Sequence, residues 1–129
     1  MVVDTSALVA ILQGEPERRA FIEAIDGADS RRMSAATFVE TSIVIEARYG
    51  GEGVRDLDRF VGLAGIELIP VSIEQAQAAR AAFSRFGKRR HRAALNYGDC
   101  FSYALAVVFG EALLCKGDDF RHTDVMLAS

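Results

Sequence analysis

The sequence has few of the features that mark secreted, membrane or zinc-binding proteins. Its 2 cysteines, Cys100 and Cys115, lie in apolar stretches and form no CxxC pair, so we expect reduced, packed thiols. No basic region precedes an apolar run at the N-terminus, as it would in a signal peptide. The longest apolar stretch, residues 100–109, is too short to cross a bilayer. The sequence therefore predicts a cytoplasmic protein that has no membrane segment.

Excess positive charge and paired histidines are also missing. The chain has 15 Lys and Arg residues against 18 Asp and Glu residues, a formal net charge of -3, so it has no general attraction for a polyanion. A nucleic acid would have to be held by a local basic patch or by a bound cation. His91 and His122 have no HxxxH or HExxH partner, and we interpret both as surface residues rather than zinc ligands.

The pattern of apolar residues predicts one α/β domain over residues 1–129. Apolar runs at residues 1–3, 32–35, 66–71 and 112–115 indicate strands. Helical patterns occupy residues 6–13, 16–25, 37–49, 53–63, 73–86 and 98–109. Alternating strands and helices favour a parallel sheet with helices on both faces, which is a three-layer sandwich. In such folds ligands bind at the carboxyl ends of the strands.

Three acidic residues stand apart from all other charges. Asp4, Glu40 and Asp99 each lie in a stretch with no other charged residue. Most other acids lie in polar stretches that contain residues of both charges, as expected of a solvated surface. Asp4 directly follows the first predicted strand, and Glu40 and Asp99 fall in the first turns of predicted helices. Asp118 and Asp119 follow the last predicted strand. Because parallel strands end at one edge of a sheet, we expect all of these side chains to meet there.

Each of these acids could instead cap a helix. Asp4 could cap the helix that follows it, and Thr37 with Glu40, or Asn96 with Asp99, fits the spacing of a capping box. Caps need not converge, however, and two carboxylates about 4 Å apart repel by roughly 4 kcal/mol at an effective dielectric near 20. A bound dication would remove that cost. Because the set offers only hard oxygen ligands, it favours Mg²⁺ or Mn²⁺ over zinc.

A cation held in this way suits phosphodiester hydrolysis. It can lower the pKa of a water, orient a phosphate and stabilise charge on the leaving oxygen. A carboxylate oxygen left free by the metal could take the proton of the attacking water. Thr5 and Ser6, directly after Asp4, could hold a metal-bound water or a phosphate oxygen, or they could serve only to begin a helix.

A basic segment lies just before the predicted helix of Asp99. Residues 85–92 carry 5 of the 15 cationic side chains. Its members Lys88, Arg89, Arg90 and Arg92 could hold an RNA backbone beside the metal site. The alternative is an ordinary solvated loop.

Short motifs surround the acids. Residues 1–8 read MVVDTSAL, Asp99 lies in the sequence YGDC, and Asp118 and Asp119 precede a phenylalanine. Together with Glu40, and in the same order, these motifs resemble those of the PIN-domain ribonucleases, whose first strand runs into Asp-Thr/Ser-Ser. The resemblance covers nearly the whole chain. Its compact length is similar to that of the VapC toxins of bacterial toxin–antitoxin pairs.

The resemblance implies a sheet of four or five parallel strands, RNA cleavage that depends on Mg²⁺ or Mn²⁺, and usually a homodimer. By position, Asp4, Glu40 and Asp99 would be the catalytic, metal-binding acids. The fourth acid is open between Asp119, which aligns with the Asp-Phe pair, and Asp118, which is nearer to the strand end. VapC toxins are held inactive by a VapB-type antitoxin whose tail covers the active site, so a partner of that kind is expected.

Other functions fit only parts of the pattern. A phosphoacceptor receiver domain would have two acids after the first strand and an Asp after the third, but Asp4 stands alone and residues 66–72 end without an acid. A haloacid-type phosphatase would have a second Asp two residues after Asp4. A non-catalytic module, folded like a PIN domain but only binding RNA or protein, would not need the full acidic set.

Overall fold

A computed structural model describes residues 1–128 of the chain. The described strands form one parallel sheet in the order β3-β2-β1-β4. They are β1 (Val2–Val3), β2 (Arg32–Ser34), β3 (Glu67–Ile69) and β4 (Leu113–Leu114). The helices are α1 (Thr5–Leu12), α2 (Arg18–Asp26), α3 (Ala35–Ala64), α4 (Ile73–Phe86), α5 (Tyr97–Phe109) and a 3-10 helix, η1 (Asp119–His122). The predicted α/β class is confirmed. Residue 129, the last of the predicted domain, lies outside the described part.

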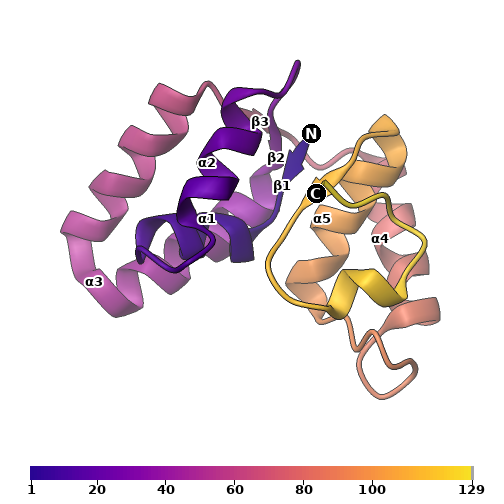
Figure 1. The fold of residues 1–129 in the computed structure, drawn as a ribbon. Helices are drawn as coiled ribbons and strands as arrows, with labels where there is room; N and C mark the ends of the chain where they lie inside the picture. Colours follow the sequence, from indigo (N-terminus) through magenta and orange to yellow (C-terminus); the bar gives the residue numbers. More distant parts are fainter. Residues whose placement is uncertain (129) are drawn as a thin grey trace.

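Helices cover both faces of the sheet (Figure 1): α1, α2 and α3 lie on one side, and α4 and α5 on the other. Successive side chains of a strand point to opposite faces, and β1 shows this clearly. Val2 packs into the core beneath α4 and α5, whereas Val3 packs into the core beneath α1, α2 and α3. Leu113 and Leu114 of β4 divide in the same way. The protein therefore has one hydrophobic core on each face, as the three-layer prediction requires.

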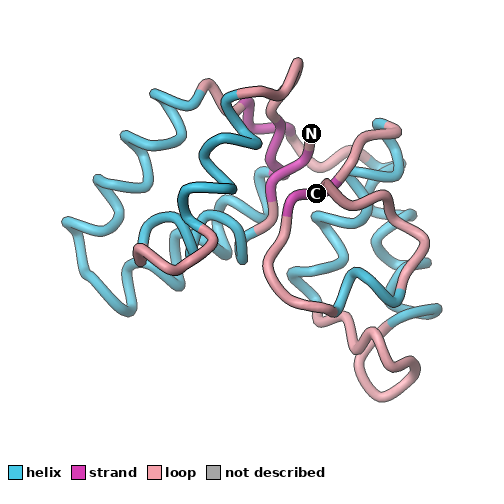
Figure 2. Tube along the Cα trace, in the orientation of Figure 1, coloured by secondary structure: helices cyan, strands magenta, loops and turns pink. Residues whose placement is uncertain are grey.

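The central strands end side by side. Val3 lies opposite Leu114, and the backbone N–H of Asp4 donates to the carbonyl of Leu114 at 3.0 Å. Figure 2 shows the chain leaving β1 and β4 on the same side of the sheet. This edge holds the beginning of α1 and the segment that leads to η1.

The region after β2 differs from the prediction. The predicted helices at 37–49 and 53–63 form one element, α3, kinked at Gly50, whose φ of 65° and ψ of -156° are open only to glycine. The helix begins at Ala35, and its cap is Ser34, whose Oγ accepts from the N–H of Ala36 at 3.2 Å. The predicted capping box of Thr37 is therefore wrong, and Glu40 lies in the second turn rather than the first.

Two smaller differences concern burial and length. The strand predicted at 66–71 spans only Glu67–Ile69, because Pro70 follows it and cannot donate to a sheet. The helix predicted at 98–109 is apolar on every face in the sequence, which favours full burial, but it exposes Val107 and Phe109 in its last turn. None of the helices within residues 1–128 is both long and apolar enough for a membrane span.

Candidate active site

Asp4 is buried at the end of β1 and is held by two serines. Its Oδ2 accepts hydrogen bonds from the N–H of Ser6 at 3.1 Å and from the Oγ of Ser6 at 2.7 Å. Its Oδ1 accepts from the Oγ of Ser102 on α5 at 2.5 Å. Asp4 is thus the N-cap of α1 and also an acid fixed between α1 and α5. Both interpretations of the sequence therefore apply to Asp4: it caps a helix, and it lies at the edge where the acids were predicted to meet.

Glu40 reaches the same edge from α3. Its Oε1 accepts from the Oγ of Thr5 at 2.7 Å, and Thr41 in turn donates to that hydroxyl at 2.9 Å. Its Oε2 lies against Gly98, so close that a Cβ on Gly98 would be 1.9 Å from the oxygen. Burial raises the pKa of Glu40, the hydrogen bond from Thr5 lowers it, and the charge of Asp4 raises it. Glu40 therefore packs against the first turn of α5.

Asp99 stands in that first turn of α5. Its carboxylate accepts from the N–H of Asn96 at 3.0 Å, and the side chain of Asn96 accepts from the N–H of Asp99 at 2.9 Å, which completes the predicted capping box. Burial raises the pKa of Asp99 to about 7; the hydrogen bond from Asn96 opposes the rise, and the charges of Asp4, Glu40 and Asp119 add to it. Four acids far apart in the chain therefore share one electrostatic environment.

The two candidates for the fourth acid have different surroundings. Asp119, the first residue of η1, is among the charges that raise the pKa of Asp99 and also that of Cys115. Asp118 is exposed and forms an ion pair with Arg121 at 3.3 Å. Position therefore favours Asp119 as a member of the acidic cluster, and we define this cluster as Asp4, Glu40, Asp99 and Asp119.

The donor set fits a hard divalent cation, although it is not a closed cage. Within residues 1–128, no three His, Cys, Asp or Glu side chains are grouped so that they could hold an ion by themselves. Mg²⁺ usually keeps several waters and binds through one or two carboxylates, so it does not require such a cage. Burial first, and then the charges of Asp4, Glu40 and Asp119, raise the pKa of Asp99, and a bound cation would offset both effects. Asp4, Glu40, Asp99 and Asp119 are the residues that would hold the ion.

Thr5 and Ser6 are both hydrogen-bonded to the acids in this structure. Thr5 donates to Glu40, and the hydroxyl of Ser6 donates to Asp4 and accepts from the N–H of Lys116 at 2.9 Å. Ser6 thereby connects the end of β1 to the end of β4. These contacts position the carboxylates, and the predicted contacts with water or phosphate stay a prediction.

The basic segment connects α4 to α5 at the lower end of Figure 1, near η1. Lys88, Arg89, Arg90 and Arg92 are exposed, as expected of residues that contact a polyanion. Backbone hydrogen bonds close the loop, among them one from the N–H of Lys88 to the carbonyl of Leu95 at 2.9 Å. The loop ends at Asn96, which caps the helix of Asp99, and the placement of its charges beside the acidic cluster stays a prediction.

Two other side chains near this segment have structural partners. Arg85 pairs with Asp124 at 3.3 Å. His91 is half-buried, with its ring edge-on to Phe86 at 5.1 Å between centroids and its Nδ1 accepting from the N–H of Ala93 at 3.0 Å. Our interpretation of His91 as a surface residue is thus only partly right.

The chain matches a known protein family over nearly its whole length. The family model described as the PIN domain matches residues 1–126. The chain belongs to the PIN-domain family. It is 55% identical over 125 residues to a ribonuclease VapC of Mycolicibacterium smegmatis, with 97% of each chain covered. It is 54% identical over 125 residues to ribonuclease VapC30 of Mycobacterium tuberculosis, with 97% of this chain and 95% of the relative covered.

Solved structures of low sequence identity share the fold. The crystal structure of VapC20 of Mycobacterium tuberculosis, described as a sarcin-ricin loop cleaving toxin, matches with a TM-score of 0.79 at 16% identity, covering 98% of this chain and 97% of that one. VapBC2 from Rickettsia felis matches with a TM-score of 0.77 at 14% identity, covering 98% and 96%. The PIN fold expected from the motifs is confirmed.

Sequence reasoning missed the residues that position the acids of this PIN domain. Ser102 binds Asp4 and also lies 3.2 Å from the Oγ of Thr37, and all three are buried. A hydroxyl one turn after Asp99 in an otherwise apolar helix was the available signal for Ser102. The sequence offered no comparable signal for Gly98. The carboxylate that packs against it belongs to Glu40 on α3, which is a distant part of the chain.

Proposed function

We propose that this PIN-domain protein is an endoribonuclease that hydrolyses RNA phosphodiester bonds with Mg²⁺ or Mn²⁺. The observation that carries the proposal is the acidic cluster, whose members come from four separate parts of the chain, and in which burial, and after it the charges of the other acids, raise the pKa of Asp99. Such crowding of carboxylates is costly unless a cation neutralises it. The relatives named VapC ribonucleases, which cover nearly the whole chain, support the same activity.

The residues divide into acids and residues that position them. Ser6 and Ser102 fix the orientation of Asp4, and Thr5 fixes that of Glu40. When bound, the cation would supply a water of lowered pKa and would stabilise charge on the leaving oxygen. Burial and the neighbouring acids raise the pKa of Asp99 to about 7 in the metal-free protein, and a bound cation would lower it again and keep Asp99 ionised as a ligand.

In this proposal, basic residues outside the acidic cluster bind the RNA substrate. The exposed cations Lys88, Arg89, Arg90 and Arg92 offer a positive surface in a protein whose net charge is -3. Phosphate contacts of this kind give affinity without sequence preference and become weaker as salt rises. RNA would therefore lie along the loop, with one phosphate at the acidic cluster.

The protein acts, in this proposal, as a toxin that a VapB-type antitoxin neutralises in the cytoplasm. The VapC relatives support this role, and structural neighbours of the same fold include a toxin–antitoxin complex from Klebsiella pneumoniae. A homodimer is proposed on the family resemblance alone.

The test is cleavage of RNA by purified, antitoxin-free protein with and without Mg²⁺ or Mn²⁺. We expect cleavage that EDTA stops and that Asp4→Asn or Asp99→Asn abolishes. Glu74→Gln, an exposed acid in the first turn of α4, is the matched control and should cleave normally. Equal activity in the Asp99→Asn variant would refute the assignment, and RNA binding without any cleavage would favour a non-catalytic module.

Metal binding has its own readout, independent of cleavage. An ion present at 100 times its dissociation constant should raise the free energy of unfolding by about 2.7 kcal/mol. We expect Mn²⁺ to raise the melting temperature of the native protein and to have a smaller effect on Asp99→Asn. The absence of any shift with Mn²⁺ would argue against the metal site.

A further inference from the structure

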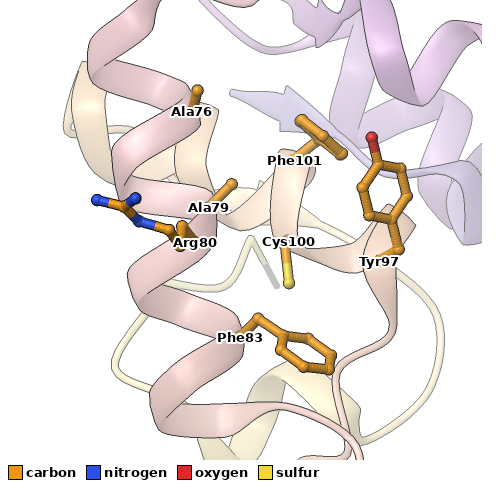
Figure 3. A pocket seen from close by; sticks show the side chains of 7 residues that line it. All are labelled: Ala76, Ala79, Arg80, Phe83, Tyr97, Cys100 and Phe101. Carbon is orange, nitrogen blue, oxygen red and sulfur yellow. The ribbon is translucent and has the colours of Figure 1, made fainter.

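A lysine that follows β4 is held by two acids from another loop. The ammonium of Lys116 forms ion pairs with Glu15 and, at 3.3 Å, with the Oε1 of Glu17. Both acids lie in the connection between α1 and α2. This connection is on the face of the sheet that α1 and α2 cover (Figure 1), whereas the apolar pocket of Figure 3 lies between α4 and α5 on the other face. We call Lys116, Glu15 and Glu17 the lysine cluster.

The acids of the lysine cluster are themselves fixed in place. The Oε2 of Glu15 accepts a hydrogen bond from the side-chain amide of Gln13 at 2.7 Å, and the Oε1 of Gln13 accepts from Arg48 on α3 at 2.6 Å. The Oε1 of Glu17 is buried and has no hydrogen bond within residues 1–128, so the ammonium compensates its charge. Lys116 therefore meets an ordered pair of acids rather than mobile surface charges.

The segment from Lys116 to Asp119 has few other attachments. All of its residues are exposed. Within residues 1–128, the hydrogen bonds and ion pairs that join this segment to distant parts of the chain all start at Lys116. Its N–H donates to the Oγ of Ser6 at 2.9 Å, and its ammonium binds the two glutamates. Gly117, the next residue, has a φ of 100° and no side chain, so it can act as a pivot for the residues that follow.

We propose that Lys116 is a positioning residue for Asp119, because the lysine cluster holds the segment 116–119 where Asp119 can serve the cation. This inference rests on the proposed metal-dependent function. In this role the ammonium touches neither the ion nor the RNA. Lys116 is attached through both its backbone and its side chain, and the two attachments together fix the direction in which the chain continues to Asp119.

The charge of Lys116 alone predicts the opposite effect on metal binding. A positive side chain near a cation site repels the cation, so the loss of Lys116 would tighten metal binding if the residue acted only by its charge. If Lys116 positions Asp119, its loss should weaken metal binding, because a carboxylate ligand is no longer held at the ion. The direction of the change therefore separates the two roles.

The first test is Mn²⁺ binding to RNA-free protein, measured by isothermal titration calorimetry. We expect Lys116→Met to weaken Mn²⁺ binding by about 10-fold, the scale for a supporting group of a metal site. Lys116→Arg, which keeps the charge and a similar reach, should retain the native affinity. Lys116→Met added to Asp119→Asn should have little further effect, because Lys116 acts through Asp119. Unchanged or tighter binding by Lys116→Met would overturn the proposal, as would full additivity of the two substitutions.

The matched control is Arg19→Met, which removes an exposed arginine paired with Glu23 at 3.2 Å in the same helix, α2. It loses the same charge and should bind Mn²⁺ as the native protein does. Exposed ion pairs contribute little to stability, so we expect Lys116→Met to fold normally. Circular dichroism and urea denaturation check this.

A second measurement follows the segment itself, without metal. In isotope-labelled native protein in EDTA, the backbone NMR order parameters of Gly117 and Asp119 should lie near the value of rigid backbone, about 0.85. In Lys116→Met they should fall into the flexible range, below about 0.6, while the order parameter of Ala7 in α1 stays unchanged. Equal values for the segment in both proteins would overturn the proposal, because the segment would then be held without Lys116.

The outcomes also separate this inference from the proposed function. Native Mn²⁺ binding and cleavage, with no effect of Lys116→Met on either, would leave the nuclease in place and refute the positioning role. A segment that loosens in Lys116→Met, in a native protein that binds no Mn²⁺, would refute the nuclease while the anchoring by the lysine cluster stands. Weaker RNA binding by Lys116→Met at unchanged Mn²⁺ affinity would make Lys116 a phosphate contact and overturn its role as a positioning residue.

Discussion

Ser102 and Asp4 lie 98 residues apart in the chain, and the hydroxyl of Ser102 donates a hydrogen bond of 2.5 Å to the Oδ1 of Asp4. The same hydroxyl lies 3.2 Å from the Oγ of Thr37 on α3. One buried polar network thus joins α5, α3 and the end of β1. Because Ser6 holds the other carboxylate oxygen, Asp4 keeps one orientation.

Ser102→Ala should therefore impair both folding and activity. Removing a hydrogen bond to a charged group lowers the free energy of unfolding by about 1.5–3 kcal/mol. The loss of orientation at Asp4 should lower kcat by up to about 100-fold, the scale of a misplacement of about 1 Å. Urea denaturation and cleavage kinetics measure the two effects.

The matched control is Ser42→Ala, which removes a hydroxyl that donates to the carbonyl of Phe38 at 2.8 Å, one turn back on α3. It should leave cleavage unchanged. Normal kcat in Ser102→Ala would show that Asp4 needs no partner on α5.

Gly98→Ala tests the packing of Glu40 on α5. A Cβ at this position would lie 1.9 Å from the Oε2 and 2.4 Å from the Cδ of Glu40, so the carboxylate must move away. Because the end of a glutamate is flexible, we expect a stability loss of only about 1–3 kcal/mol, typical of overpacking, but a large fall in cleavage. The control is Gly62→Ala within α3, where nothing lies within 4 Å of the new Cβ. That variant should be stabilised by about 0.5–1 kcal/mol and should cleave normally.

The neighbouring acids Asp118 and Asp119 form a matched pair for mutation. Asp119→Asn removes a charge that acts on Asp99, and we expect cleavage and Mn²⁺ affinity to fall by roughly 10-fold or more, the scale of losing one supporting group of a metal site. Asp118→Asn removes only an exposed ion pair with Arg121, worth at most about 1 kcal/mol. It should retain activity. The reverse ranking would move the fourth position to Asp118.

The fold could be predicted from the sequence because its signals are local. Strands of two or three residues were located within two residues or so at each end, since each is a short apolar run between helical patterns. Gly50 misled the prediction of α3. A glycine at the end of a helical pattern usually predicts the end of the helix, whereas the permissive backbone of Gly50 allows a kink, after which the helix continues.

The site was harder to predict from the sequence than the fold, because its contacts join distant parts of the chain. Asp4 and Asp99 stood out as isolated charges in apolar sequence, and the fold brings both to the carboxyl edge. The roles of Ser102 and Gly98 depend on side chains that approach from other elements. Periodicity and spacing along one element carry no information about such contacts.

The pH dependence of stability tests the cost of burying the Asp99 carboxylate among the other acids. Burial, together with the charges of Asp4, Glu40 and Asp119, raises the pKa of Asp99 from 3.8 to about 7. Between these values the native state binds more protons than the unfolded chain, so in EDTA this group should make the free energy of unfolding fall as pH rises from about 4 to about 7. Asp99→Asn keeps a carbonyl that can accept from the N–H of Asn96 and removes the charge.

Asp99→Asn should accordingly be more stable than the native protein above pH 7 in EDTA, by about 1–3 kcal/mol. One pKa unit corresponds to about 1.36 kcal/mol, and the partial exposure of the carboxyl reduces the full value. Urea denaturation at several pH values measures the difference, and Asp118→Asn, which alters only an exposed acid, should follow the native curve. Addition of Mn²⁺ should close the gap, because the cation then stabilises the native carboxylates and binds the Asn variant less well. A native protein that is no less stable than Asp99→Asn at every pH in EDTA would mean that burial and the neighbouring acids do not raise the pKa of Asp99, and the case for a cation at this carboxylate would lose its physical basis.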